Sequence, residues 1–426
     1  MVTPLLLSKM PAHGVERLAM DSYAQVRTLS KQSLQTCANQ QAHKFAFKQS
    51  ICRKLARALS LISLISCLTS VSRAQDPNFS QFEMNPLYYN PANAGSVTDL
   101  RFGINYRNLW LNVPGIKFPG PFSTYNFYMD KQFSNALIGG LGAFVYQNFK
   151  GEGYLRHTSG GFIYSWRMPT KQNNYFLSFG TKIYVNQLKI DWSRLVFSDQ
   201  VDPERGYLTT PSAFVPQNDG KKTYLDIDAG VTFGFNVFQN KTDEQKWTNE
   251  FSFAVAHLVR PDVSLNDIES QLPMKYTAMY NTSFPLSKNK FYFNPKILFE
   301  KQDDFLAYTY GFNMYVVKRH PFKSAFSRFY FTKPLYLGFY FRNPKLNDLK
   351  NTKSLIFVAG HTGKFSSSDT RYQLGVSYDF TIGGLNLSTW GALEISATIV
   401  FATKSVTKKA NRYCPKFNTS PLSPVN

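Results

Sequence analysis

The stretch Leu225–Val237 alternates strictly between apolar and non-apolar residues. Its odd positions are all apolar, and its even positions, which include Asp226, Asp228 and Thr232, hold no large apolar residue. A period of two places the two sets on opposite faces of one β-strand. At about 3.3 Å per residue, this strand exceeds the roughly 17–20 Å of an ordinary globular strand. It is long enough for a tilted membrane crossing, which takes about 9–11 residues.

The two faces of this strand require two different surroundings. If the apolar face meets lipid, the carboxylates of Asp226 and Asp228 must face a wet lumen. A closed barrel is the sheet that satisfies all its backbone hydrogen bonds in lipid. The sequence therefore predicts an all-β fold, an antiparallel transmembrane outer-membrane β-barrel with an irregular N-terminal segment.

The same alternation recurs along the chain and predicts about fourteen strands, an even number as in bacterial barrels. The long polar connection Ile190–Thr223 is expected to be an extracellular loop, and Phe238–Glu250 a turn or short loop. The candidate strands are Arg101–Arg107, Ser123–Asp130, Leu137–Asn148, Thr158–Trp166, Leu177–Val185, Leu225–Val237, Phe251–Val259, Pro273–Asn281, Phe291–Glu300, Phe305–Tyr315, Tyr330–Arg342, Ser354–Gly360, Leu374–Phe380 and Leu393–Phe401.

Composition is consistent with a barrel and favours acidic partners. Aromatic residues make up 16% of the chain, with 38 Phe and 25 Tyr, and they are enriched in strands and in the girdles of barrels. The net charge is +21, and residues 1–74, with ten Lys/Arg and two acidic residues, leave +13 for the remainder. This excess favours lipopolysaccharide, a surface polymer or an acidic protein face. The scattering of the cations disfavours nucleic acid.

Residues 51–74 have the features of a secretory signal peptide. A basic pair is followed by the apolar run 58–65 and by a small-x-small site that predicts cleavage between Ala74 and Gln75. The run is too short for a membrane anchor, which needs about 20 residues. Residues 1–50 form an N-terminal extension of open status. Cleavage leaves Cys414 without an intramolecular partner; a lipidated Cys67 is the competing interpretation.

Residues 75–100 are expected to form a proline-rich coil before the first strand. Two Asn-Pro pairs lie close together and argue against a helix or a central strand. Such a stiff segment loses little entropy when it docks, so it suits an internal plug or a partner-binding arm; a simple lead-in to the first strand is the alternative. The residues concerned are Asn85, Pro86, Leu87, Tyr88, Tyr89, Asn90 and Pro91.

Several motifs together resemble the PorP/SprF family of Bacteroidetes outer-membrane proteins. A start in Gln-Asp, Phe-Ser-Gln at Phe79–Gln81 and the Asn-Pro-Leu-Tyr-x-Asn-Pro-Ala run carry the resemblance near the N-terminus, and closing strands with a Cys-Pro-x-Phe tail carry it at the other end. The barrel is expected over residues 101–402 and a C-terminal tail over 403–426. The family-like positions inside the barrel are Tyr106, Arg107, Asn108, Trp110, Ser377, Tyr378, Asp379, Phe380 and Glu394.

The resemblance implies a non-enzymatic barrel that works in type IX secretion or gliding. Members of the family are associated with secretion, anchoring or display of exported proteins, including gliding adhesins. The implied partners are outer-membrane lipid, periplasmic and outer-membrane components of the machine, and exported cargo. A channel or transporter for small hydrophobic or sugar substrates is the alternative from another class.

The sequence offers few residues for catalysis or for binding a cofactor or metal, and none is predicted. His157-x-Ser159 could place a base and a nucleophile on the outside of the barrel for lipid hydrolysis, but no third group that orients them is identifiable. Asp226 and Asp228 could bind a cation, although lumenal carboxylates more often balance Lys and Arg. The excess of Tyr and Phe suits girdle and packing roles better than carbohydrate stacking.

Overall fold

The structure is a computed structural model. It describes residues 76–401 apart from 98, 112–121, 134–138, 152, 169–174, 205, 208–210, 214–219, 239–245, 266–268, 288–290, 317–334, 346–352, 366–369 and 383–389. The predicted extension, signal peptide, cleavage site and C-terminal tail lie outside the described residues. Among the residues described, no helix is long and apolar enough to cross a membrane.

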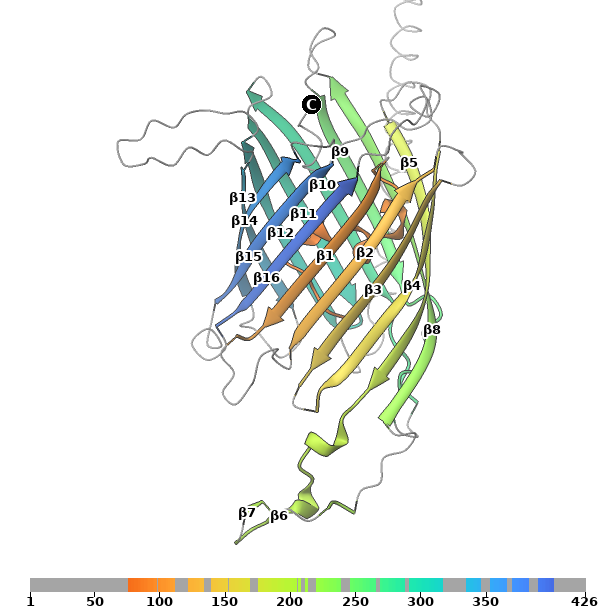
Figure 1. The fold of residues 1–426 in the computed structure, drawn as a ribbon, viewed down its shortest axis with the longest axis vertical. Helices are drawn as coiled ribbons and strands as arrows, with labels where there is room; N and C mark the ends of the chain where they lie inside the picture. Colours follow the sequence, from red (N-terminus) through yellow and green to blue (C-terminus); the bar gives the residue numbers. More distant parts are fainter. Residues whose placement is uncertain are drawn as a thin grey trace, which may run out of the picture. The chain divides into compact units, whose positions relative to one another are not determined.

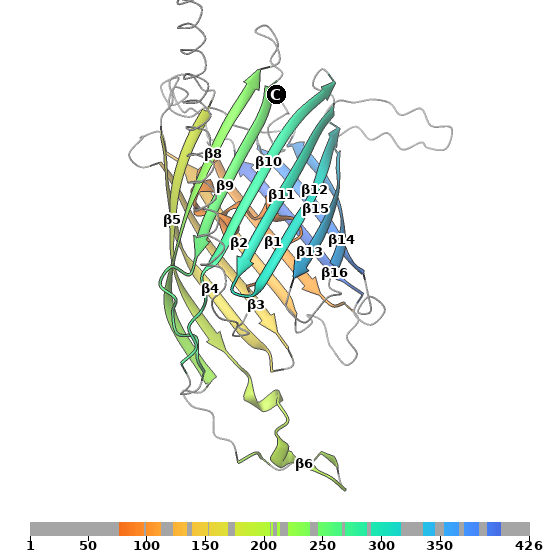
Figure 2. The same cartoon turned by 180° about the vertical axis from the view of Figure 1, so that it is seen from behind.

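Within the described residues, fourteen strands pair in one closed antiparallel ring (Figures 1 and 2). Neighbours along the chain pair with each other, and the first strand closes the ring against the last. The barrel strands are β1 (Leu100–Leu109), β2 (Ser123–Gln132), β3 (Gly140–Lys150), β4 (Leu155–Arg167), β5 (Tyr175–Lys189), β8 (Lys221–Phe238), β9 (Lys246–Ala256), β10 (Lys275–Ser287), β11 (Phe291–Gln302), β12 (Phe305–Val316), β13 (Leu335–Lys345), β14 (Lys353–Lys364), β15 (Arg371–Ile382) and β16 (Ala392–Phe401).

The two faces of β8 confirm the predicted alternation. Leu225 is 54% exposed and Phe233 40%, whereas Asp226 is fully buried and Thr232 is 1% exposed. The same pattern on the other strands gives the barrel an apolar outside and a polar, filled inside. The prediction of a wet lumen face needs correction, because the inner face of β8 packs against the chain's own N-terminal residues.

Each predicted strand has a counterpart, with some boundaries displaced. The expected turn Phe238–Glu250 is shorter, because β8 runs to Phe238 and β9 already begins at Lys246. The predicted end of that strand at Val259 is wrong: His257 has a φ of 61°, which turns the chain out of the sheet. The connection after β5 contains short elements: η3 (Trp192–Arg194), η4 (Ser198–Gln200), and the two-stranded hairpin of β6 (Val201–Asp202) and β7 (Gly206–Tyr207).

The residues before β1 fold inside the barrel, and we call Asp76–Val97 the luminal segment (Figure 1). It contains η1 (Phe82–Met84), α2 (Pro86–Tyr89) and η2 (Pro91–Asn93). The prediction that the two Asn-Pro pairs disfavour a helix is therefore wrong for the single turn of α2. Pro86 and Pro91 each occupy the start of a short helix, where the missing N–H costs nothing and the fixed φ is already helical.

The core of the molecule lies between the luminal segment and the inner faces of the strands. Phe79, Phe82 and Tyr89 pack with inward-facing apolar residues of β10 to β14, among them Leu298 and Tyr336. A second buried cluster joins Leu87 and Ala94 to inward-facing residues of β2 to β5. The luminal segment thus supplies part of the hydrophobic core that the barrel wall alone lacks.

Candidate functional site

Four charged side chains meet where the first and last strands of the barrel join. They are Arg107 on β1, Arg342 on β13, Asp379 on β15 and Glu394 on β16, and we call them the seam cluster. Arg107 Nη2 lies 2.8 Å from Asp379 Oδ2, and Arg107 Nη1 lies 3.1 Å from Glu394 Oε2. Arg342 Nη1 lies 3.0 Å from Asp379 Oδ2. Two cations and two anions, all buried, make the cluster electrically neutral.

The seam cluster holds the start of the luminal segment. The backbone N–H of Ser80 donates to Glu394 Oε2 at 2.6 Å, and its hydroxyl donates to the Asp379 carboxylate at 2.6 and 2.7 Å. The N–H of Gln81 donates to Glu394 Oε1 at 3.0 Å, and Arg107 Nη1 donates to Ser80 Oγ. Hydrogen bonds to charged groups contribute about 1.5–3 kcal/mol each, so this cluster is a strong anchor.

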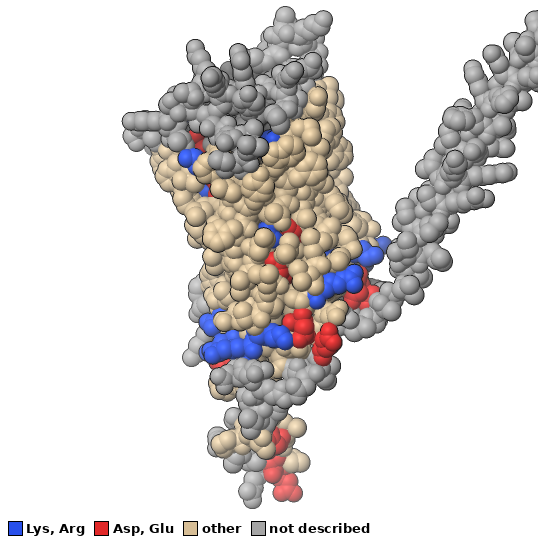
Figure 3. Space-filling view, turned by 90° about the vertical axis from the view of Figure 1, so that its right-hand side faces the viewer, with Lys and Arg blue, Asp and Glu red and all other residues tan. Residues whose placement is uncertain are grey.

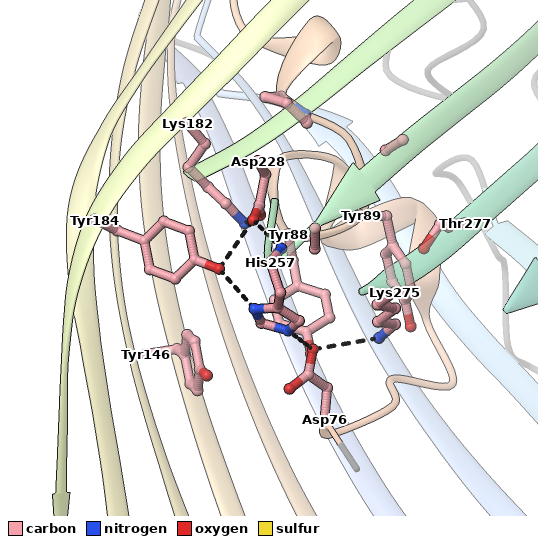
Figure 4. A pocket seen from close by; sticks show the side chains of 13 residues that line it. Asp76, Tyr88, Tyr89, Tyr146, Lys182, Tyr184, Asp228, His257, Lys275 and Thr277 are labelled. Atoms are coloured by element: carbon pink, nitrogen blue, oxygen red, sulfur yellow. Dashed lines mark hydrogen bonds and ion pairs between the residues drawn. The ribbon is translucent and has the colours of Figure 1, made fainter. Parts of the chain in front are cut away.

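A second charged cluster anchors Asp76, near the start of the luminal segment (Figure 4). Asp76 Oδ2 lies 2.9 Å from His257 Nε2, and the other ring nitrogen of His257 lies 2.5 Å from Asp226 Oδ2. The Lys182 ammonium lies 2.5 Å from Asp228 Oδ2. We call the following residues the Asp76 cluster: Asp76, Lys182, Tyr184, Asp226, Asp228, His257, Lys275 and Glu300.

Electrostatics keeps the Asp76 carboxylate ionised. Burial alone would raise its pKa, but His257 and Lys275 together lower the pKa of Asp76 well below the usual range. A cavity of about 30 Å³ lies beside it, between Tyr146 and Thr277. A water needs roughly 10–15 Å³ of such volume, so this cavity suits water and is too small for a substrate.

The middle of the luminal segment is held by one asparagine. Asn90 Oδ1 accepts from Ala92 N at 2.8 Å, which caps η2. Asn90 Nδ2 donates to the carbonyl oxygens of Val231 at 3.0 Å and Phe253 at 3.2 Å. The side chain thus joins the segment to β8 and β9, at the point where the chain enters the second Asn-Pro pair.

Two wall glycines make room for this contact. A Cβ on Gly180 would stand 2.3 Å from Ala92 N and from the carbonyl carbon of Pro91. A Cβ on Gly230 would stand 2.1 Å from Asn90 Oδ1. Side chains at these positions would collide with the segment, so the wall is shaped to fit it.

The structure places the predicted range Asn85–Pro91 inside the lumen. Leu87 and Tyr89 are buried, and the Tyr88 hydroxyl donates to Pro77 O at 2.6 Å. Asn85 accepts a hydrogen bond of 2.7 Å from Asn126 on β2. These residues are therefore oriented towards the barrel wall and towards the segment itself.

The family-like positions come together only in part. Arg107, Asp379 and Glu394 meet in the seam cluster, although they lie at opposite ends of the sequence. The others have separate places: Asn108 and Ser377 are buried, Phe380 is 45% exposed, Tyr106 packs on Tyr125, Tyr378 donates to Trp390 O, and Trp110 packs on Phe122 after β1.

His157 and Ser159 do not lie on the outside of the barrel, so that hypothesis is wrong about their location. Both are buried in the lumen. His157 Nε2 lies 3.0 Å from Asn186 Oδ1, to which Ser159 Oγ also donates at 2.5 Å. Ser159 therefore donates its hydrogen bond to an amide oxygen rather than to His157, and the arrangement suits packing better than nucleophilic attack.

Asp226 and Asp228 lie close enough to His257 for a shared ion, with candidate ligand atoms within 4.8 Å of one another. Each of them already has a partner of its own: Asp228 has Lys182, and Asp226 has His257. A cation would have to replace these contacts. The positions of Asp226 and Asp228 thus fit carboxylates that balance lumenal cations better than they fit ligands of a metal ion.

Sequence patterns do not single out the other anchoring residues. Ser80 and Gln81 belong to a motif of the resemblance, but nothing in that motif indicates that their backbone binds carboxylates. Lys182 and Asp228 are directly opposite each other on β5 and β8. Charged residues at inward positions of alternating strands are the available signal, since such a charge requires a partner.

Comparison with known families decides the identity of the chain. A family model described as "Type IX secretion system membrane protein PorP/SprF" matches residues 71–399, well over half of the sequence. The chain belongs to the PorP/SprF family. This PorP/SprF-family protein is accordingly an integral outer-membrane barrel of type IX secretion.

Other comparisons add little to this assignment. No curated protein matches the PorP/SprF-family chain. Among solved structures it is similar to the CymD monoaromatic hydrocarbon channel (TM-score 0.42, 11% identity, covering 76% of this chain and 94% of that one). It is also similar to a Pseudomonas aeruginosa FadL homologue (TM-score 0.38, 10% identity, 74% and 93% covered). Likeness at this level carries no argument about function.

Proposed function

We propose that this PorP/SprF-family barrel is a closed, non-enzymatic scaffold that binds protein partners during type IX secretion. Its partners would be other components of the machine and the exported proteins that it helps to display, including gliding adhesins. The luminal segment acts as the plug. The loops at the ends of the barrel supply the surface for partners.

The docking of residues 76–97 in the lumen is the observation that carries this proposal. A transporter for small hydrophobic or sugar substrates requires a path through the barrel. Here, charged clusters at two places and a buried apolar core fix the chain's own residues across the lumen. Their many specific contacts favour a permanent closure over a gate that opens for each substrate.

The position of the plug also fits cleavage at the predicted site. Asp76, the second residue of the predicted mature chain, is anchored in the lumen. A mature chain that begins at Gln75 would have its N-terminus directly beside this anchor. We therefore propose that the signal peptide, residues 51–74, is removed between Ala74 and Gln75 before the plug settles.

Deletion of residues 75–93 behind an intact signal peptide tests the scaffold function. We expect a folded barrel in the outer membrane and a loss of the exported partner from the cell surface. A matched control replaces Ile183 and Val185, which lie exposed on the outer face of β5 away from both the lumen and the loops, with leucine. Barrel folding, measured as a heat-resistant band, and surface cargo are followed in the same strain.

The outcomes of this test separate the alternatives. Normal cargo display by the deletion variant would overturn the proposed role of the plug. Steady conductance of the unaltered protein in planar bilayers without any partner would favour the transporter. Affinity purification from outer membranes, followed by identification of co-purifying proteins, then tests the scaffold directly.

A further inference from the structure

Three basic residues form one row across neighbouring strands. Arg156 on β4 is directly opposite Lys189 on β5, and Lys189 is directly opposite Lys221 on β8. Directly opposite residues have Cβ atoms about 4.5–5.5 Å apart. The three cations are therefore immediate neighbours on the sheet.

The row lies on the outer face of the barrel. Lys189 is an even number of residues from Val185, which is 51% exposed, and Lys221 is likewise in phase with Leu225, which is 54% exposed. Arg156 is in phase with Phe162, which is 78% exposed. None of the three strands shows a register shift over this stretch. The side chains must therefore point away from the lumen.

The barrel wall, as far as the structure describes it, offers the row no counter-charge. Every acidic side chain in the described barrel strands is buried and faces the lumen. Lumenal cations such as Lys182 and Lys275 are paired with carboxylates, whereas the three outer cations are not among the ion pairs of the described residues. Like charges that are directly opposite each other destabilise a sheet. An anion bound to the row would relieve this repulsion.

The surroundings of the row indicate what that anion is attached to. Two residues along each strand from the cations lies a row of neutral polar residues, Thr158, Gln187 and Thr223. Two residues beyond that row, the apolar surface begins with Val185 and Leu225. At about 3.3 Å per residue, the cations are about 13 Å along the strand from that apolar row. This order of apolar, neutral and cationic rows matches the acyl chains, linkage and phosphate of a lipid. Figure 3, which looks at this side, shows Lys and Arg near the lower end of the uncharged surface, with some Asp and Glu beside them.

We propose that the row Arg156–Lys189–Lys221 binds the phosphate groups of a phosphorylated glycolipid in the outer leaflet. An Arg guanidinium binds two phosphate oxygens at once, and Lys adds point charges beside it. The row lies at the end of the barrel that carries the long β5–β8 connection, and long connections are extracellular in such barrels. A disaccharide with two phosphates fits three adjacent cations better than the single phosphate of a glycerophospholipid.

The proposal is tested on the purified full-length barrel in a non-ionic detergent. The row variant is Arg156→Gln, Lys189→Gln and Lys221→Gln. The matched control replaces three outward lysines of the same end, Lys301, Lys345 and Lys353, with Gln; no two of these are directly opposite each other. The probes are diphosphoryl lipid A, phosphatidylglycerol and inorganic phosphate, and the readouts are bound lipid by native mass spectrometry and the midpoint of thermal unfolding.

We expect the row variant to lose at least tenfold in lipid A affinity, and the control to lose less than threefold. Because the repulsion is relieved, the row variant should unfold at a higher temperature than the unaltered protein when no lipid is present. With lipid A present, the unaltered protein should unfold at a higher temperature than the row variant. The single variant Lys189→Gln gives the same comparison if the triple variant does not fold.

Several results would overturn the proposal. Equal lipid A affinity of the row variant and the unaltered protein would show that the row is not the site. Equal binding of phosphatidylglycerol would show an unspecific cationic belt. Competition by inorganic phosphate at the same concentration as lipid A would show a site for free anions.

Discussion

Replacing Gly180 with alanine should release the luminal segment without opening the barrel. The added methyl group would stand 2.3 Å from Ala92 N, whereas ordinary contacts begin at 3.4 Å. The backbone of the segment would thus have to retreat by about 1 Å, and overpacking of this kind costs about 1–3 kcal/mol. The retreat would also weaken the two hydrogen bonds from Asn90 to Val231 and Phe253, each worth about 0.5–1.5 kcal/mol.

Chymotrypsin provides the assay, because the luminal segment offers buried sites at Phe79, Phe82 and Tyr89. The combined cost of about 2–6 kcal/mol corresponds to well over tenfold in the population of the released segment. When release is rapid compared with cleavage, the cleavage rate follows this population. We expect N-terminal fragments, identified by mass spectrometry, to appear at least ten times faster from the variant in its folded, heat-resistant form.

The control is Gly160→Ala. A Cβ at that position would meet Val145 at 3.5 Å and the Phe144 carbonyl at 3.6 Å, both ordinary contacts. It faces away from the lumen, so cleavage should match that of the unaltered protein. A folded Gly180→Ala barrel with an unchanged cleavage rate would refute the idea that the wall and the segment are fitted at this point.

Three further predictions concern the strands, the seam and the N-terminus. Val231→Arg should destabilise the barrel by about 2–4 kcal/mol if the residue lies near the bilayer midplane, whereas Thr232→Arg should leave a folded barrel with a displaced luminal segment. Heat-resistant bands measure folding of each variant, and chymotrypsin cleavage measures release of the segment. A larger loss of folding in Thr232→Arg than in Val231→Arg would contradict the assigned faces. Arg107→Met should cost about 3–5 kcal/mol in urea unfolding because it strands buried carboxylates, with partial recovery on adding Glu394→Gln; an unchanged midpoint would argue against the seam cluster as an anchor. Mass spectrometry of the mature protein should find Gln75 at its N-terminus, and a lipid-modified cysteine there would support a lipoprotein instead.

The sequence predicts the wall of this barrel better than its contents. A period of two is a local signal, so the strand Leu225–Val237 and its two faces can be recognised without knowing its neighbours. The short helix at Pro86 escapes prediction when proline is treated as a helix breaker rather than as a first helical residue. The outside location expected for His157 fails for a related reason: a pair two residues apart shares a face, but the spacing alone does not say which face.

The clusters that hold the luminal segment could not be predicted from local patterns. Lys182 and Asp228 both occupy inward positions, yet their pairing depends on the register between β5 and β8, which are separated by the long connection. The seam cluster depends on ring closure between the first and last strands. The alternation of residues indicates on which face of the sheet a side chain lies, but it does not indicate where along the barrel axis that side chain lies relative to those of other strands.

The seam cluster also constrains the order in which the protein can assemble. Ser80 and Glu394 are 314 residues apart in the chain and yet are hydrogen-bonded. Contacts so distant in sequence form late and slow folding, so the first residues of the barrel protein must wait for the last strand. Arg107 and Glu394 are directly opposite each other across the closing strands, and Ser80 binds both. The contacts of the luminal segment with the seam can therefore form only once these two strands have paired, so docking of its first residues reports that the ring has closed.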